Sequence, residues 1–227
     1  MDSRIEPIRP FIEASLEWLP QHPSYQTWII QRSGMLGVRG KPAADKTTNL
    51  RSIISSCQVD SKMSTSDDRL CLFFFFKLHG EYLSKSRIGM FRTLLHQLLQ
   101  AVPIAGHQFW HWAEEEATNA RPQDGVMDFD YLQSWFLSAL ITASCFHRII
   151  IAVDALDESC DSEHNLYTDV AREVIADLRH INRTMDSIGN AHVRICFSSR
   201  YFPAISVDNG LEIHEGPEGT IQRYLDL

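Results

Sequence analysis

The chain has 227 residues, 44% of them hydrophobic, which is enough for one sizeable α/β core. Its formal net charge of −8 disfavours broad nucleic-acid binding, because an acidic surface repels the phosphate backbone. The opening MDSRIEPIRP has no apolar core of the kind a secretory signal needs, and the most apolar run, Leu70 to Phe76, is much shorter than the about 20 residues that span a bilayer. We therefore expect a cytoplasmic protein that binds neither nucleic acid nor membrane.

Five cysteines are scattered along the chain, and no two of them form a CxxC pair. Several lie in or beside strongly apolar segments, so we expect buried free thiols rather than disulfides or a metal site.

Residues 1–30 are predicted to form a helical lead-in anchored by large apolar side chains, and residues 31–227 to form the main domain. The anchors are Phe11, Leu16, Trp18, Leu19 and Trp28.

Several short segments are apolar throughout rather than alternating, as expected of parallel strands buried on both faces. They are Gly34 to Gly40, Leu70 to Phe76, Arg148 to Asp154 and Val193 to Ser199, with Leu211 to His214 as a weaker fifth.

Apolar residues at helical spacing fall between these strands and predict amphipathic helices. The stripes are Leu50, Ile53, Ile54 and Cys57; Ile88, Phe91, Leu95, Leu98 and Val102; Leu132, Trp135, Phe136, Ala139 and Leu140, with Asp128 or Asp130 as N-cap; and Val170, Val174, Ile175, Leu178 and Ile181. Strands that alternate with helices predict an α/β fold, a parallel sheet with helices on both faces. Residues 61–69 and 119–128 are predicted to be irregular.

The stretch GKPAADKTT, residues 40–48, resembles the phosphate-binding loop G-x-x-x-x-G-K-[ST] between a strand and a helix. Gly40 is the first glycine, Lys46 the lysine that reaches the phosphates, and Thr47 the hydroxyl that reaches Mg²⁺. Lys41, Asp45 and Thr48 complete the candidate nucleotide-binding residues. Backbone N–H groups of such a loop hold phosphates together with the helix N-terminus.

Asp45 stands where the motif has its second glycine. A side chain crowds the approach of the phosphates, and two like charges about 4 Å apart cost on the order of 4 kcal/mol at an effective dielectric of 20. Asp is also among the best N-cap residues, so its carboxylate could instead close the helix start in place of a phosphate.

The run RIIIAVDALDES ends a buried strand in Asp154, followed by Asp157 and Glu158. This is a Walker B arrangement, in which Asp154 would hold Mg²⁺ together with Thr47, and a later carboxylate would orient the attacking water. The alternative is an acidic loop at a strand end. In ICFSSR, Arg200 follows another buried strand, where it could sense a terminal phosphate or pair with an acid of the neighbouring loop.

These motifs resemble those of the NACHT-type nucleotide-binding domain of fungal STAND proteins that carry a nephrocystin-like N-terminal segment. The matching stretches are GVRGKPAADKTT, LFFFF, GMFRTLLHQLL, IIIAVDALDE and ICFSSRYFP, and they extend over nearly the whole chain. Ala43 and Asp45 depart from the family glycines.

The resemblance implies a P-loop NTPase fold with sheet order 5-1-4-3-2, binding of ATP or GTP with Mg²⁺, and a slow switch in fungal self/non-self recognition. Lys46 would bind phosphate, Thr47 and Asp154 the metal, Asp157 or Glu158 the water, and Arg200 would be the sensor. Family members usually continue with helical, winged-helix and repeat parts, which these 227 residues lack, so we expect no full switch cycle from this chain alone. The expected partners are other protein domains or further copies of the chain.

Two further interpretations remain. His107 and His111, with Glu114 and Glu115 one turn on, have a spacing that could hold a metal, although no HExxH accompanies them. The chain could also be a degenerate pseudo-NTPase that serves as a scaffold and no longer binds nucleotide.

Overall fold

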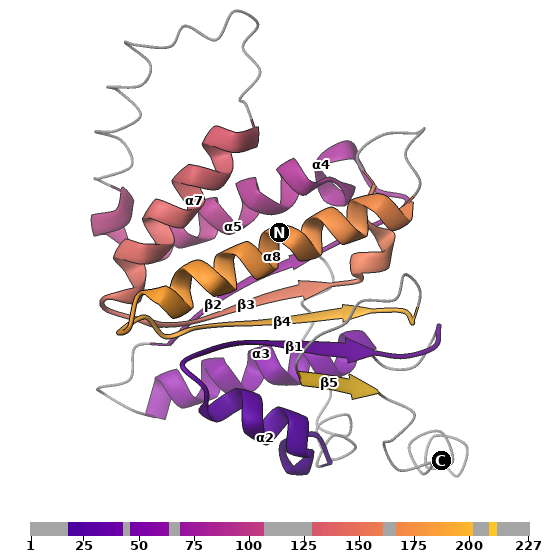
Figure 1. The fold of residues 1–227 in the computed structure, drawn as a ribbon, viewed down its shortest axis with the longest axis horizontal. Coiled ribbons are helices and arrows are strands. Elements are labelled where there is room, and N and C mark those ends of the chain that lie inside the picture. Colours follow the sequence, from indigo (N-terminus) through magenta and orange to yellow (C-terminus); the bar gives the residue numbers. More distant parts are fainter. Residues whose placement is uncertain are drawn as a thin grey trace, which may run out of the picture.

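One parallel sheet forms the centre of the molecule (Figure 1). The structure, a computed structural model, describes residues 18–42, 46–63, 69–106, 129–160, 167–201 and 209–212. Its strands are β1 (Ser33–Arg39), β2 (Arg69–Phe75), β3 (Arg148–Asp154), β4 (Val193–Ser199) and β5 (Asn209–Glu212). Its helices are η1 (Leu19–Gln21), α2 (Pro23–Ile30), α3 (Lys46–Met63), α4 (Tyr82–Lys85), α5 (Arg87–Ala101), α7 (Phe129–Ser144), η2 (Leu156–Glu158) and α8 (Tyr167–Ser187).

The five strands pair in parallel in the order β2-β3-β4-β1-β5, which read from the other edge is 5-1-4-3-2. Both the α/β class and the order that the family resemblance implied are therefore confirmed.

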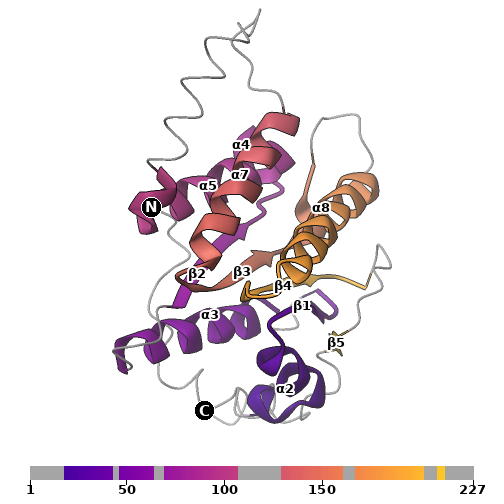
Figure 2. The ribbon, with the colours of Figure 1, turned by 60° about the vertical axis from the view of Figure 1, so that its left-hand side comes forward.

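Helices cover both faces of the sheet (Figure 2). One face packs against α5, α7 and α8, and the other against α3 and α2. The side chains of each strand divide between the two cores, so that on β3 Ile149, Ile151 and Val153 lie in one and Ile150 and Ala152 in the other. A strand that must be apolar on both faces shows no alternation, which explains the continuous apolar runs in the sequence.

The strand predictions agree closely with the structure. β3 and β4 begin and end where predicted, and β1 and β2 are displaced by one residue. The fifth strand begins two residues earlier than predicted, because Asn209 pairs with Leu36 of β1 and so becomes part of the sheet.

The four predicted helices are present, with small differences at their ends. Asp130 is not an N-cap: α7 begins at Phe129, and Asp130 lies in its first turn, where its charge complements the helix N-terminus. Asp128 lies outside the described residues. Residues 61–63 belong to α3 rather than to the predicted loop, and segment 119–128 is not described.

The described part of the lead-in packs against β1 and β5. Trp28 is fully buried, and its indole N–H donates to the carbonyl of Gly34 at 3.2 Å. Ser24 donates to the carbonyl of Gly210 at 2.9 Å, and Arg194 of β4 donates to the last turn of α2 at Ile29. The anchors Leu19 and Trp28 are thus in the core, whereas Phe11 and Leu16 lie outside the described residues. The domain boundary at residue 30 stays a prediction.

The parallel register brings the carboxyl ends of four strands to one edge of the sheet. Arg39 pairs with Ser199 at the end of β1 and β4, and Phe75 pairs with Asp154 at the end of β2 and β3. Ligands of open α/β sheets bind at this edge. Among the described helices, none is long and apolar enough to cross a membrane.

Candidate functional site

A polar cleft of about 450 Å³ lies at the carboxyl edge of the sheet. It is lined by residues from the start of α3 and from the segments after β1, β3 and β4. They are Pro42, Lys46, Thr47, Thr48, Asp154, Ala155, Asp157, Glu158, Ser198 and Arg200. The structure therefore brings together residues that are more than 150 positions apart in the sequence and that the motifs predicted separately.

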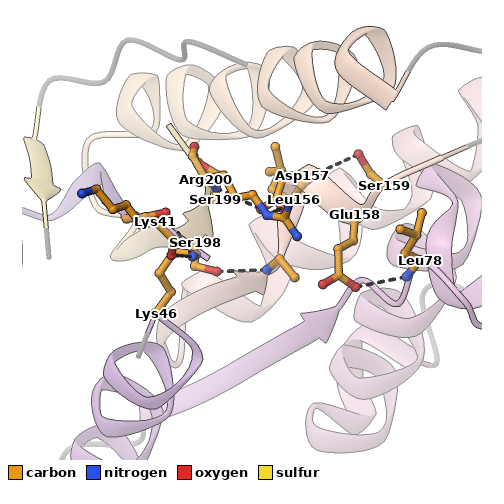
Figure 3. A network of polar contacts seen from close by, with 12 residues as sticks. Lys41, Lys46, Leu78, Leu156, Asp157, Glu158, Ser159, Ser198, Ser199 and Arg200 are labelled. Atoms are coloured by element: carbon orange, nitrogen blue, oxygen red, sulfur yellow. Dashed lines mark hydrogen bonds and ion pairs between the residues drawn. The ribbon is translucent and has the colours of Figure 1, made fainter. Parts of the chain in front are cut away.

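Lys46 is the first residue of α3 and turns its amine back onto the preceding loop (Figure 3). Its Nζ donates to the carbonyls of Gly40 at 3.1 Å and Lys41 at 2.7 Å. Burial lowers the pKa of Lys46 from its usual value, and the neighbouring Arg200 lowers it further, while Asp157 acts in the opposite direction. A phosphate oxygen would favour the charged amine at this position.

Asp154 is fully buried at the end of β3 and is held on both carboxylate oxygens. The hydroxyl of Thr47 donates to Oδ2 at 2.8 Å, and the hydroxyl of Ser198 donates to Oδ1. Ser198 in turn accepts the N–H of Ala155 at 2.9 Å. Ala155 has a left-handed backbone with φ 54°, which costs a residue with a Cβ some strain, and this hydrogen bond helps to hold it.

Asp157 and Arg200 form a two-point pair. Asp157 Oδ2 lies 2.9 Å from the Nε of Arg200, and Oδ1 accepts the backbone N–H of the same residue at 3.0 Å. The alternative that Arg200 pairs with an acid of the neighbouring loop is thus what the structure shows, and this arginine still lines the cleft.

Glu158 reaches in another direction, toward the connection that follows β2 (Figure 3). Its Oε2 accepts the backbone N–H of Leu78 at 3.1 Å. Cys160, two residues after Glu158, also contacts the segment that follows β2, since its N–H donates to the carbonyl of Lys85 at 2.7 Å.

The remaining predicted residues of the phosphate loop differ in their contacts. Gly40 is buried, and its N–H donates to the carbonyl of Ser199 at 3.3 Å. Lys41 is exposed and contributes a carbonyl to Lys46, and half-buried Thr48 lines the cleft. Ala43 and Asp45 lie outside the described residues, so neither the crowding nor the capping interpretation of Asp45 is tested.

The donor set fits a hard cation such as Mg²⁺. Thr47 donates its hydroxyl proton to Asp154, so the lone pairs of Oγ1 remain available to a metal, and the carboxylate beside it is a preferred oxygen ligand. In the part of the chain that the structure describes, no group of three or more His, Cys, Asp or Glu could hold a metal. The predicted cluster at His107, His111, Glu114 and Glu115 is not described.

Sequence reasoning did not assign two contacts of the site. It placed Ser198 at a strand end without a role, and it had no means to find the backbone of Leu78. The pattern that could have pointed to Ser198 is a hydroxyl at the end of a strand predicted to lie beside the Asp154 strand.

The model of the family described as Nephrocystin 3, N-terminal, matches residues 14–200. A comparison with curated proteins found no match. Among solved structures, the Aeropyrum pernix ORC2 protein in its ADPNP-ADP complexes superposes with a TM-score of 0.45 at 13% identity. That alignment covers 93% of this chain and 50% of the other, so the chain spans about half of that protein's length.

Proposed function

The chain belongs to the nephrocystin 3 N-terminal family, and we propose that it is the nucleotide-binding P-loop module of a fungal STAND signalling switch, with weak or absent hydrolysis. The observation that carries this proposal is the meeting of Lys46, Thr47, Asp154 and Arg200 in one cleft at the carboxyl edge of the sheet. The ligand would be ATP or GTP with Mg²⁺, and protein domains or further copies of the chain would be its other partners.

In this proposal, each of these residues of the cleft contacts a different part of the bound nucleotide. Lys46 and the N-terminus of α3 would hold phosphate oxygens, since a helix start favours negative charge. Thr47 and Asp154 would hold Mg²⁺, which neutralises phosphate charge when bound. Arg200 would meet the terminal phosphate with its fork of donors.

Two contacts support slow or absent turnover. Asp157 is already engaged by Arg200, and Glu158 by the N–H of Leu78. Either carboxylate would have to share or exchange that contact to position an attacking water.

The same contacts favour a second candidate, a pseudo-NTPase scaffold. Lys46 is held by two carbonyls of its own loop, and Arg200 by Asp157. Both cations that a phosphate would need thus have partners within the chain, and Asp45 replaces the motif's glycine.

Calorimetric titration of ATP, ADP, GTP and GDP with Mg²⁺ separates the two candidates. Lys46→Ala should weaken binding by more than tenfold, because it removes a charge-assisted contact to phosphate. Arg92→Ala removes one positive charge from the exposed side of α5 and is the matched control.

Binding by the parent chain that survives Lys46→Ala unchanged would sink the first candidate. A silent parent chain that gains affinity through Asp45→Gly would identify a loop disabled by one carboxylate, and the scaffold function would stand.

A further inference from the structure

The ion pair between Asp157 and Arg200 joins a largely buried side chain to an exposed one. The side chain of Asp157 is 9% exposed, and that of Arg200 is 52% exposed. Asp157 lies in η2, directly after the strand that carries Asp154, and it contacts both the backbone and the side chain of Arg200. A long side chain half in solvent has many rotamers, and this two-point contact restricts them.

The contact uses the inner part of the guanidinium group. Asp157 Oδ2 lies 2.9 Å from Nε and Oδ1 accepts the backbone N–H, while the terminal Nη groups of Arg200 donate no hydrogen bond to any described residue. Those two groups form the fork that binds phosphate in a bidentate manner. Arg200 lines the cleft beside Lys46 and Thr47, so the fork lies at the phosphate-binding edge.

Resting on the proposed function, we propose that Asp157 is a positioning residue that aims Arg200 at the terminal phosphate and so sets the discrimination between nucleoside triphosphate and diphosphate. Asp157 then acts through Arg200, and the carboxylate left to position water is Glu158, which Leu78 holds through one oxygen.

The direction in which Asp157→Asn changes the preference for triphosphate over diphosphate distinguishes positioning from simple charge repulsion. Removal of the negative charge of Asp157 would, by Coulomb's law alone, favour the more highly charged triphosphate. Positioning predicts the reverse, because an Arg200 without its anchor loses the contact that the triphosphate makes and the diphosphate does not.

The experiment measures Kd for Mg·ATP and Mg·ADP, or the guanine pair if the parent chain prefers it, in the parent, Asp157→Asn, Arg200→Ala and the double variant. We expect Asp157→Asn to raise the ratio of Kd for triphosphate to Kd for diphosphate by about tenfold, the size of one charge-assisted contact. In the Arg200→Ala background the same substitution should no longer raise the ratio, because only the loss of the negative charge remains. Glu173→Gln removes an equal charge from the exposed Glu173 that pairs with Arg87, and should leave the ratio as in the parent.

A second measurement needs no nucleotide. The Nε–H signal of Arg200 in an NMR spectrum, assigned with Arg200→Lys, should change its chemical shift in Asp157→Asn, because the carboxylate 2.9 Å from Nε loses its charge. An unchanged signal would overturn the contact on which the positioning role depends.

The outcomes separate this inference from the proposed function. A parent chain that binds no nucleotide overturns both. A parent that binds, with a ratio that stays constant or falls in Asp157→Asn, overturns the positioning role alone. A rise in the ratio that persists in the Arg200→Ala background overturns it as well.

Discussion

Ser198 is predicted to be a main support of the site, and Ser198→Ala tests this. The hydroxyl donates to the carboxylate of Asp154 and accepts the N–H of Ala155. Ser198 is 1% exposed and Asp154 is fully buried, so water cannot readily replace the lost donor. A hydrogen bond to a charged group contributes about 1.5–3 kcal/mol, and a buried donor left without a partner costs about 1–3 kcal/mol.

The N–H of Ala155 belongs to a half-buried residue and can regain water in part, so we take about 3 kcal/mol as the total loss. For a chain of this size, 1 kcal/mol lowers the melting temperature by about 2–4 °C, and the variant should melt about 6–12 °C lower. Differential scanning calorimetry of the ligand-free chain measures the shift.

Ser199→Ala is the matched control. Ser199 is the next residue of β4 and is also fully buried, but its hydroxyl donates to a neutral carbonyl, that of Arg200, at 3.0 Å. Its loss should cost about 1 kcal/mol. Equal melting temperatures for the two variants would refute the reasoning, because they would mean that the carboxylate of Asp154 gains nothing particular from Ser198.

Three further predictions concern packing, pH and metal. Gly89→Ala should lower the free energy of unfolding in urea by about 3 kcal/mol, because the new Cβ would lie 1.7 Å from the carbonyl oxygen of Leu83. Gly189→Ala is the control and should have no such effect, because nothing lies within 4 Å of a Cβ there. Burial raises the pKa of Asp177 above its usual value of 3.8, although the neighbouring Arg87 opposes this shift. The contribution of Asp177 to the free energy of unfolding is therefore greatest below pH 3.8 and declines as the pH rises through the folded-state pKa. The destabilisation caused by Asp177→Asn should therefore be larger at pH 3.5 than at pH 7 in thermal melts, and an equal loss at both would contradict the shift. If the chain binds nucleotide, EDTA in the calorimeter should weaken that binding by more than tenfold, and a Kd unchanged by EDTA would leave Asp154 with a structural role alone.

The parts of the fold that the sequence predicted best are those governed by burial alone. β3 runs from Arg148 to Asp154 as predicted, because a strand covered on both faces is apolar until a charged residue ends it. β5 was misplaced by two residues, because Asn209 and Gly210 have little strand propensity and are in the sheet only through pairing with β1.

In the candidate site, too, some features could be predicted from the sequence and others could not. Lys46, Thr47 and Asp154 could be placed in advance, because each motif fixes a residue at the end of a strand or the start of a helix. The partners of the acids could not be read from spacing. Ser198 is 44 positions from Asp154, and Leu78 is 80 positions from Glu158, so these contacts depend on which strands are neighbours and in which register.

The charges of the cleft bear directly on the question that Asp45 raises. The described lining carries two cations, Lys46 and Arg200, against three carboxylates. Asp45, which directly precedes Lys46 in the sequence, adds a further negative charge to this loop. A phosphate group that enters such a cleft meets net negative charge and cations that already have partners. Binding is then favourable only if a metal at Thr47 and Asp154 supplies the missing positive charge, so a chain with aspartate in place of the loop glycine should depend on Mg²⁺ more strongly than one that keeps the glycine.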